Sequence, residues 1–134
     1  MTGWLIDTCA LARIGASHDA AAWAERIDRG LVRIAVVTAS RSTTRLDPDL
    51  RNAVRRAPLA SMPIEYQTPA IEDRAIEVQT LVAESGRHRA ASIADLIVAA
   101  TAELAGLVAL HLYKDFDVIA EITGQPTEKL SVAP

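Results

Sequence analysis

The sequence predicts an α/β fold in which a central, mostly parallel sheet is covered by helices on both faces. Short apolar segments alternate along the chain with longer segments whose apolar residues recur at helical spacing, as in a succession of strand–helix units. Hydrophobic residues make up 50% of the 134 and aromatic residues only 4%, so the core must consist mainly of Leu, Ile, Val and Ala. No repeat or linker divides the chain, and we expect residues 1–134 to form a single domain.

The individual elements follow from the spacing of apolar residues in chain order. Short apolar runs predict strands within residues 3–8, 31–38, 62–66, 107–112 and 127–134. Helical spacing predicts a short helix, a turn and an amphipathic helix within residues 10–30, two pieces within 40–60, and single helices over 69–86, 92–106 and 114–124. We expect the segment before the 92–106 helix to be a basic loop.

Proline and glycine explain several of the predicted boundaries. A residue that precedes proline disfavours the helical conformation, so the helical region within residues 40–60 is expected to break before Pro48. Pro69 suits the first turn of a helix, and Gly86 suits the end of the same helix. Gly106 is expected to end the following helix.

Three large apolar residues in the first part of the chain have two open interpretations. Trp23 and Ile27 fall on one face of the amphipathic helix, and Leu11 belongs to the short helix before it. They are either ordinary core residues or the lining of an apolar groove that binds a partner peptide.

Charge and cysteine content limit the classes of protein to which the chain can belong. A net charge of −3 and a pI of about 5.6 argue against a basic, non-specific nucleic-acid binder, but not against a nuclease with an acidic site. Cys9 is the only cysteine, which excludes an intramolecular disulfide, and we expect it to be a small buried side chain. The longest apolar stretch contains Asp95 and Glu103, and the N-terminus does not resemble a signal peptide. We therefore expect a cytoplasmic protein with no membrane association.

Aspartates lie where several predicted strands end or where the next helix begins. Asp7 leaves the first strand, Asp95 lies in the first turn of a helix, and Asp115 and Asp117 follow the strand within residues 107–112. Working groups of open parallel sheets gather outside the carboxyl ends of the strands. Carboxylates at one edge repel each other unless a cation intervenes, and Mg²⁺ prefers such oxygen ligands. A site of this kind activates water and neutralises a phosphodiester.

Each of these aspartates also has a purely structural interpretation. Ser92 and Asp95 match a capping box, in which both side chains bond the first amides of a helix. Asp115 and Asp117 can cap the last helix, and Asp7 can cap the short helix that follows it.

The basic loop before the 92–106 helix is open to two interpretations in the same way. Arg87, His88 and Arg89 either face solvent or contact the phosphates of RNA.

Three segments resemble a known family of nucleases. LIDTCAL resembles the start of PIN-domain ribonucleases, with Cys9 where serine is usual. HRAASIADLIVAATAELAGL resembles their third-acid helix, and VALHLYKDFDVIAEITGQP resembles their last strand and helix. The similarity covers nearly the whole chain and is greatest to VapC toxins of type II toxin–antitoxin systems.

This resemblance implies a fold, an activity and partners. The fold is a PIN-like three-layer α/β/α domain with a central, mostly parallel sheet. The activity is that of an endoribonuclease toxin that depends on Mg²⁺ or Mn²⁺ and cleaves structured RNA, either tRNA or rRNA. The partners are a VapB-type antitoxin, which neutralises the toxin, and a second copy of the chain in a homodimer.

The resemblance also assigns the acids of the metal site, and two of four positions depart from the family pattern. Asp7 corresponds to the first acid and Asp95 to the third, with Asp115 as support, and all three are expected to bind metal and act in catalysis. Arg41 occupies the second position and Tyr113 the fourth. Because Arg41 adds positive charge and Tyr113 is neutral, we expect weakened activity. The alternative is a catalytically inert PIN fold that binds antitoxin, RNA or both.

Overall fold

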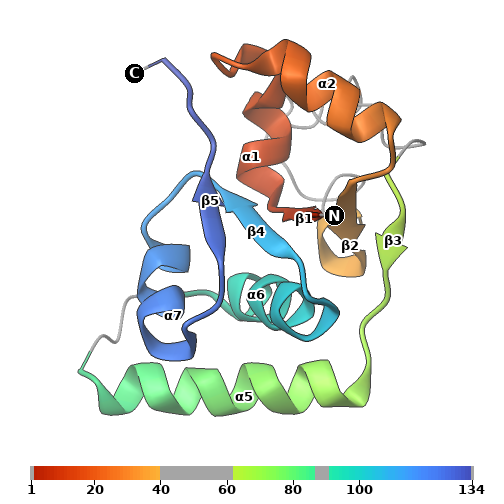
Figure 1. Ribbon diagram of the computed structural model, residues 1–134. Helices are drawn as coiled ribbons and strands as arrows, with labels where there is room; N and C mark the ends of the chain where they lie inside the picture. Colours follow the sequence, from red (N-terminus) through yellow and green to blue (C-terminus); the bar gives the residue numbers. More distant parts are fainter. Residues whose placement is uncertain (1, 40–61, 87–90, 134) are drawn as a thin grey trace.

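The fold of residues 2–39, 62–86 and 91–133 is described by a computed structural model (Figure 1). The sheet has the order β3-β2-β1-β4-β5, and every neighbouring pair of strands is parallel, which confirms the predicted architecture. The strands are β1 (Trp4–Ile6), β2 (Val32–Ala35), β3 (Ile64–Glu65), β4 (Val108–His111) and β5 (Thr127–Lys129). The helices are α1 (Thr8–Arg13), the 3₁₀ helix η1 (Ile14–Ala16), α2 (Ala20–Asp28), α5 (Pro69–Glu84), α6 (Ile93–Ala105) and α7 (Asp115–Thr123).

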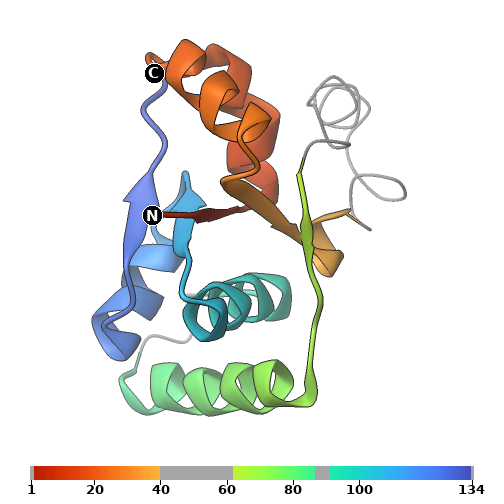
Figure 2. The same cartoon turned by 45° about the vertical axis from the view of Figure 1, so that its right-hand side comes forward.

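Helices cover both faces of the sheet and form three layers. Side chains of a strand alternate between faces, so Leu5 joins one core cluster while its neighbours Trp4 and Ile6 join the other. The Leu5 cluster packs against α5, α6 and α7, and the Trp4 cluster packs against α1, η1 and α2. Figures 1 and 2 show these two helical layers on opposite sides of the sheet.

The observed strands are shorter than the apolar runs that predict them. The second strand ends at Ala35, and residues 36–39 are helical, whereas the sequence predicts a strand to residue 38. Two adjacent valines favour a strand locally, but Val36 is exposed and lies one residue past Ala35, the last residue of β2 that pairs with a neighbour among the described strands. The first strand likewise ends at Ile6, and Thr8 already belongs to α1. The helices predicted within residues 40–60 lie outside the described ranges.

Trp23, Ile27 and Leu11 are core residues. Their exposed fractions are 1%, 3% and 1%, so the prediction that they line an open groove is wrong. The Trp23 ring meets Trp4 edge-on with 5.1 Å between ring centroids, and the Arg26 guanidinium lies 4.3 Å from the centroid of Trp23. The contact between the two tryptophan rings, together with the Arg26 guanidinium that stacks on Trp23, thus anchors α2 on the sheet. Cys9 is half-buried and packs against the same cluster.

No helix within the described parts of the chain combines the length and the apolar character needed to cross a membrane.

The buried sheet predicts a large stability difference between two leucine truncations. Leu110 in β4 is 0% exposed, whereas Leu104 in α6 is 51% exposed. We expect Leu110→Ala to lower the free energy of unfolding by about 2–5 kcal/mol, because it removes packed atoms and leaves a cavity. The matched control Leu104→Ala is expected to change it by less than about 1 kcal/mol. Urea denaturation measures both, and equal losses would contradict the assignment of β4 to the core.

Candidate active site

Two carboxyl groups from different elements meet at the carboxyl edge of the sheet. Asp115 is the first residue of α7, and Asp95 lies in the first turn of α6. Burial raises the pKa of the Asp115 carboxyl, and the charge of Asp95 and a hydrogen bond between the two side chains raise this pKa further. A hydrogen bond between two carboxyl groups requires a proton on one of them, so this pair favours either a shared proton or a cation.

The start of α6 fixes the position of Asp95. Ser92 is the N-cap, and its Oγ accepts a hydrogen bond of 3.1 Å from the backbone amide of Asp95. The helix ends at Gly106, whose φ of 71° is a left-handed conformation that glycine adopts without strain. The predicted Ser92 cap is confirmed, while the Asp95 carboxyl group is hydrogen-bonded to Asp115. Capping and site formation therefore use different groups of the same residue.

A buried histidine fixes the turn that leads from β4 to Asp115. His111 is 1% exposed, and its ring stacks on Phe116 with 5.3 Å between centroids. Its Nδ1 lies 3.0 Å from the carbonyl oxygen of Tyr113, and since a carbonyl only accepts, the ring nitrogen donates. Burial lowers the pKa of His111 against the opposing effect of Asp117, so the ring is neutral at pH 7. The sequence does not predict this role, and its one signal is a polar residue within an apolar strand.

The two aspartates of α7 do not cap the helix in the predicted manner. Lys114 occupies the N-cap position and makes no side-chain capping hydrogen bond. Asp115 and Asp117 lie in the first turn, where their charges favour the positive end of the helix dipole.

Asp7 lies at the same edge of the sheet, where β1 ends. It is 7% exposed, and its backbone amide donates to the carbonyl of Leu110 in β4 over 3.0 Å. It occupies the N-cap position of α1, but its carboxylate makes no capping hydrogen bond, so that the predicted structural role of this side chain is wrong. Thr38, which follows β2, is fully buried, and its hydroxyl has no partner among the described residues.

The structure brings two of the three predicted ligands together. Asp95 and Asp115 are in contact, and Asp7 lies at the same edge. Within residues 2–39, 62–86 and 91–133, no three His, Cys, Asp or Glu side chains form a group that fits a metal ion. The assignment of Asp7 as a third ligand therefore stays a prediction. Four other residues of the predicted site lie outside the described ranges: Arg41, Arg87, His88 and Arg89.

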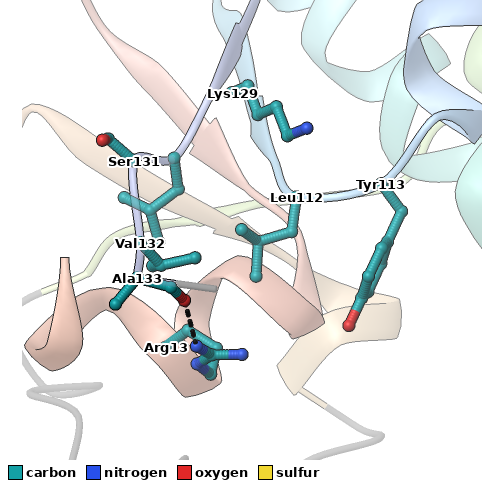
Figure 3. A pocket seen from close by; sticks show the side chains of 8 residues that line it. Arg13, Leu112, Tyr113, Lys129, Ser131, Val132 and Ala133 are labelled. Carbon is teal, nitrogen blue, oxygen red and sulfur yellow. Dashed lines mark hydrogen bonds between the residues drawn. The ribbon is translucent and has the colours of Figure 1, made fainter.

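Tyr113, at the position where the family resemblance places a fourth acid, is an exposed aromatic side chain. It lies between His111 and Asp115, and 59% of its surface is accessible. A cavity begins beside it, between the end of α1 and the segment that follows β5 (Figure 3).

Comparison with characterised proteins gives relatives over nearly the whole chain. The chain is 53% identical to Ribonuclease VapC2 of Mycobacterium tuberculosis (strain CDC 1551 / Oshkosh) over 133 residues, which span 98% of this chain and 94% of that protein. It is 43% identical to Ribonuclease VapC18 of Mycobacterium tuberculosis (strain ATCC 25618 / H37Rv), over 52% of this chain and 50% of that protein. No family model matches.

Solved structures share the fold at low sequence identity. DNA-bound VapBC from Salmonella typhimurium has a chain that superposes with a TM-score of 0.69 at 16% identity, covering 96% of this chain and 98% of that one. VapBC2 from Rickettsia felis, bound to a promoter DNA fragment, gives a TM-score of 0.71 at 12% identity with the same coverage. These similarities confirm the predicted PIN-like α/β/α architecture.

The paired carboxyl groups predict that Asp115 destabilises the metal-free protein at neutral pH. Its raised pKa means that the folded chain holds the proton more tightly than the unfolded chain. The carboxyl group therefore stabilises the fold at acidic pH, and this contribution is lost as the pH rises through the folded pKa. With EDTA at pH 7, we expect Asp115→Asn to raise the Tm by about 2–4 °C, and the gain should shrink on acidification.

The matched control for this measurement is Asp117→Asn, in the same turn of α7 and with a side chain that is 56% exposed. It removes one negative charge without touching the Asp95 pair, so its Tm should not rise. Thermal melts of the three proteins across pH check this, and a lower Tm for Asp115→Asn at pH 7 would contradict the repulsive pair.

Proposed function

The chain belongs to the VapC family of ribonucleases, and from this membership we propose that it is a metal-dependent endoribonuclease toxin of a type II toxin–antitoxin pair. The observation that carries the proposal is the contact between Asp95 and Asp115 at the carboxyl edge of the parallel sheet. The 53% identity to a ribonuclease over 98% of the chain supports it. We take residues 1–134 as one PIN-like domain.

The donor set suits Mg²⁺ or Mn²⁺. Asp95 and Asp115 supply carboxylate oxygens in direct contact, and Asp7 adds a third carboxylate at the same edge. Hard divalent ions prefer oxygen ligands and typically take few carboxylates together with water. We propose that these three residues hold the ion, which would lower the pKa of a bound water and neutralise charge on the scissile phosphate.

The environment of Asp115 favours a bound cation. Burial and the nearby Asp95 carboxyl raise the pKa of Asp115 in the metal-free protein, and a cation held by both carboxylates would take the place of the proton that they otherwise share. The neutral His111 ring holds the Tyr113 carbonyl, which keeps the turn before Asp115 in place. Together with Asp95, Asp115 would hold the ion that supplies an activated water, and the oxygen released from the cleaved strand would take up the proton that this water gives up.

Activity is expected to be weaker than in a relative with four acids. Arg41 and Tyr113 replace two carboxylates, so less negative charge is available to hold a second ion. The same two residues support the second candidate function, a catalytically inert PIN fold that retains antitoxin or RNA binding. Cleavage with Mg²⁺, tested against metal-free controls, separates the two functions.

The partners follow from the family and from the titles of the solved neighbours. VapBC complexes among these neighbours support a VapB-type antitoxin as the neutralising partner. We further propose that the substrate is structured tRNA or rRNA, that Arg87, His88 and Arg89 contact its backbone, and that the toxin acts in the cytoplasm as a homodimer.

Metal binding can be tested by calorimetric titration with Mn²⁺. Wild type is expected to give a binding signal that disappears in Asp7→Asn, because this change removes one of the three proposed carboxylate ligands. The matched control is Asp19→Asn. Asp19 is the N-cap residue of α2, and like Asp7 it makes no side-chain capping hydrogen bond, so this variant should keep the binding signal. Identical titrations of wild type and Asp7→Asn would remove Asp7 from the metal site.

The cause of weakened activity can be tested by restoring both acids. We expect Arg41→Glu combined with Tyr113→Asp to cleave RNA with Mg²⁺ at least about tenfold faster than wild type, which corresponds to about 1.4 kcal/mol of barrier. Adding Asp95→Asn should abolish the gain. Gel-based cleavage assays check both outcomes, and equal rates for wild type and the double variant would show that other acids carry the reaction.

A further inference from the structure

A cavity of about 540 Å³ opens beside Tyr113 on the side of α1 (Figure 3). Its lining comes from three places in the chain, namely the end of α1, the end of β4 and the segment that leaves β5. Leu112, Leu130 and Val132 supply apolar side chains to it. The volume lies within the range of small-molecule sites, about 300–1,000 Å³.

The wall after β5 is held in place by several bonds, so that the cavity is preformed. The backbone amide of His18 donates to the carbonyl of Ser131 over 2.8 Å, and the Ser131 hydroxyl lies 3.0 Å from His18 Nδ1. Ser17 and Val132 form an antiparallel bridge. These contacts fix the wall against the start of α2, which reduces the entropy lost when a ligand binds.

Two cations border the cavity although the chain is acidic overall. Arg13 and Lys129 are exposed, and within the described residues neither forms an ion pair with a carboxylate. The Arg13 guanidinium makes one long hydrogen bond of 3.5 Å to the carbonyl of Ala133, so most of its donors face solvent. The Lys129 charge contributes to the lowered pKa of His111, which places it beside the turn between β4 and α7.

The remaining feature is the exposed ring of Tyr113. Figure 3 shows the Tyr113 ring and Arg13 at the cavity, with Leu112 between them. An exposed aromatic face can stack on a nucleobase irrespective of base identity, because every base has a π-face. Guanidinium and ammonium groups bind phosphate oxygens through charge-assisted hydrogen bonds. An aromatic ring, an apolar floor and two cations that have no carboxylate partner in the described part of the chain together match a nucleotide.

We propose that this cavity holds one unpaired nucleotide of the RNA substrate beside the cleavage centre, with Tyr113 stacked on its base and Arg13 and Lys129 bound to its phosphates. The inference rests on the proposed ribonuclease function. Tyr113 lines the cavity and precedes Asp115 by two residues, in the turn that leads from β4 to the carboxyl edge of the sheet. Since a base must leave a duplex to stack on a side chain, the site selects single-stranded or looped RNA.

The test measures RNA binding without cleavage. In an Asp95→Asn background with EDTA, fluorescence anisotropy follows a labelled single-stranded RNA of about ten nucleotides, a length typical of single-strand sites. We expect Tyr113→Ala and Arg13→Gln each to weaken binding about tenfold, whereas Tyr113→Phe retains the ring and the affinity. Tyr66→Ala is the matched control, because Tyr66 is 70% exposed near β3, at the opposite edge of the sheet from β5.

Two further readouts examine the phosphate contacts and the stacked base. Lys129→Gln should reduce the slope of log affinity against log salt by about 0.7, the value for one lost phosphate contact on a single strand. RNA that carries 2-aminopurine should lose fluorescence when it binds protein with an unchanged cavity, because the base stacks on Tyr113. It should keep its fluorescence when it binds the Tyr113→Ala variant. Duplex RNA of the same sequence should bind more weakly than the single strand.

Several results would overturn the assignment. One is unchanged affinity of both Tyr113→Ala and Arg13→Gln. Another is an equal loss for Tyr113→Phe and Tyr113→Ala, because the hydroxyl rather than the ring would then act. Variants that bind RNA normally but lose the antitoxin would assign the cavity to that protein partner.

The failure of this inference can be told apart from failure of the proposed function. Cleavage is measured with Asp95 intact. If wild type cuts RNA with Mg²⁺, and Tyr113→Ala and Arg13→Gln bind and cut RNA as well as wild type does, the cavity assignment is wrong and the nuclease function stands. If the cavity variants weaken binding as expected but wild type cuts no RNA, the nucleotide site stands and the nuclease function is wrong.

Discussion

The contact between the carboxyl groups of Asp95 and Asp115 is the constraint on which the arrangement of this molecule depends. Burial and the nearby Asp95 carboxyl raise the pKa of Asp115, so the contact costs free energy at neutral pH when no cation is present. Packing elsewhere has to offset that cost. The cap of α6 at Ser92 and the bond from the buried His111 to the β4–α7 turn help to fix the starts of α6 and α7, from which the two carboxyl groups project.

The parallel sheet explains why these groups meet at all. Because β1 and β4 are neighbours and parallel, their carboxyl ends lie at the same edge, and Asp7 and the turn before Asp115 both begin there. β1 and β4 are short and almost fully buried, so these two strands serve as a rigid support. Polar side chains follow directly where strands end. Asp7 comes after β1, and the buried hydroxyl of Thr38 comes after β2.

Tyr113 connects the acidic edge to the neighbouring cavity. As a substitute for a carboxylate it weakens the proposed metal site, whereas as an exposed ring it offers a surface on which a base can stack. A change of Tyr113 to aspartate thus combines two opposing effects, a gain of metal ligand and a loss of substrate contact. Arg13 and Lys129 place positive charge at the cavity that Tyr113 lines, which suits a ligand that carries phosphate.

The sequence by itself determined the fold class, the order of the elements and the aspartates at the strand ends. Alternating apolar segments dictate strands and helices, and local signals such as Ser92 at the start of α6 dictate helix ends, because both act over a few residues. The resemblance to PIN-domain ribonucleases, carried by the segments around Asp7, Asp95 and Asp115, gave the family.

Only the tertiary structure decided which of these residues meet. It ended β2 at Ala35, buried Trp23 in the core and paired Asp95 with Asp115, none of which follows from local spacing. It also gave His111 its role, because a histidine in a strand acquires a partner only when the turn folds back over it. Contacts between residues distant in sequence depend on how whole elements pack, and neither propensity nor periodicity encodes that packing in any single segment.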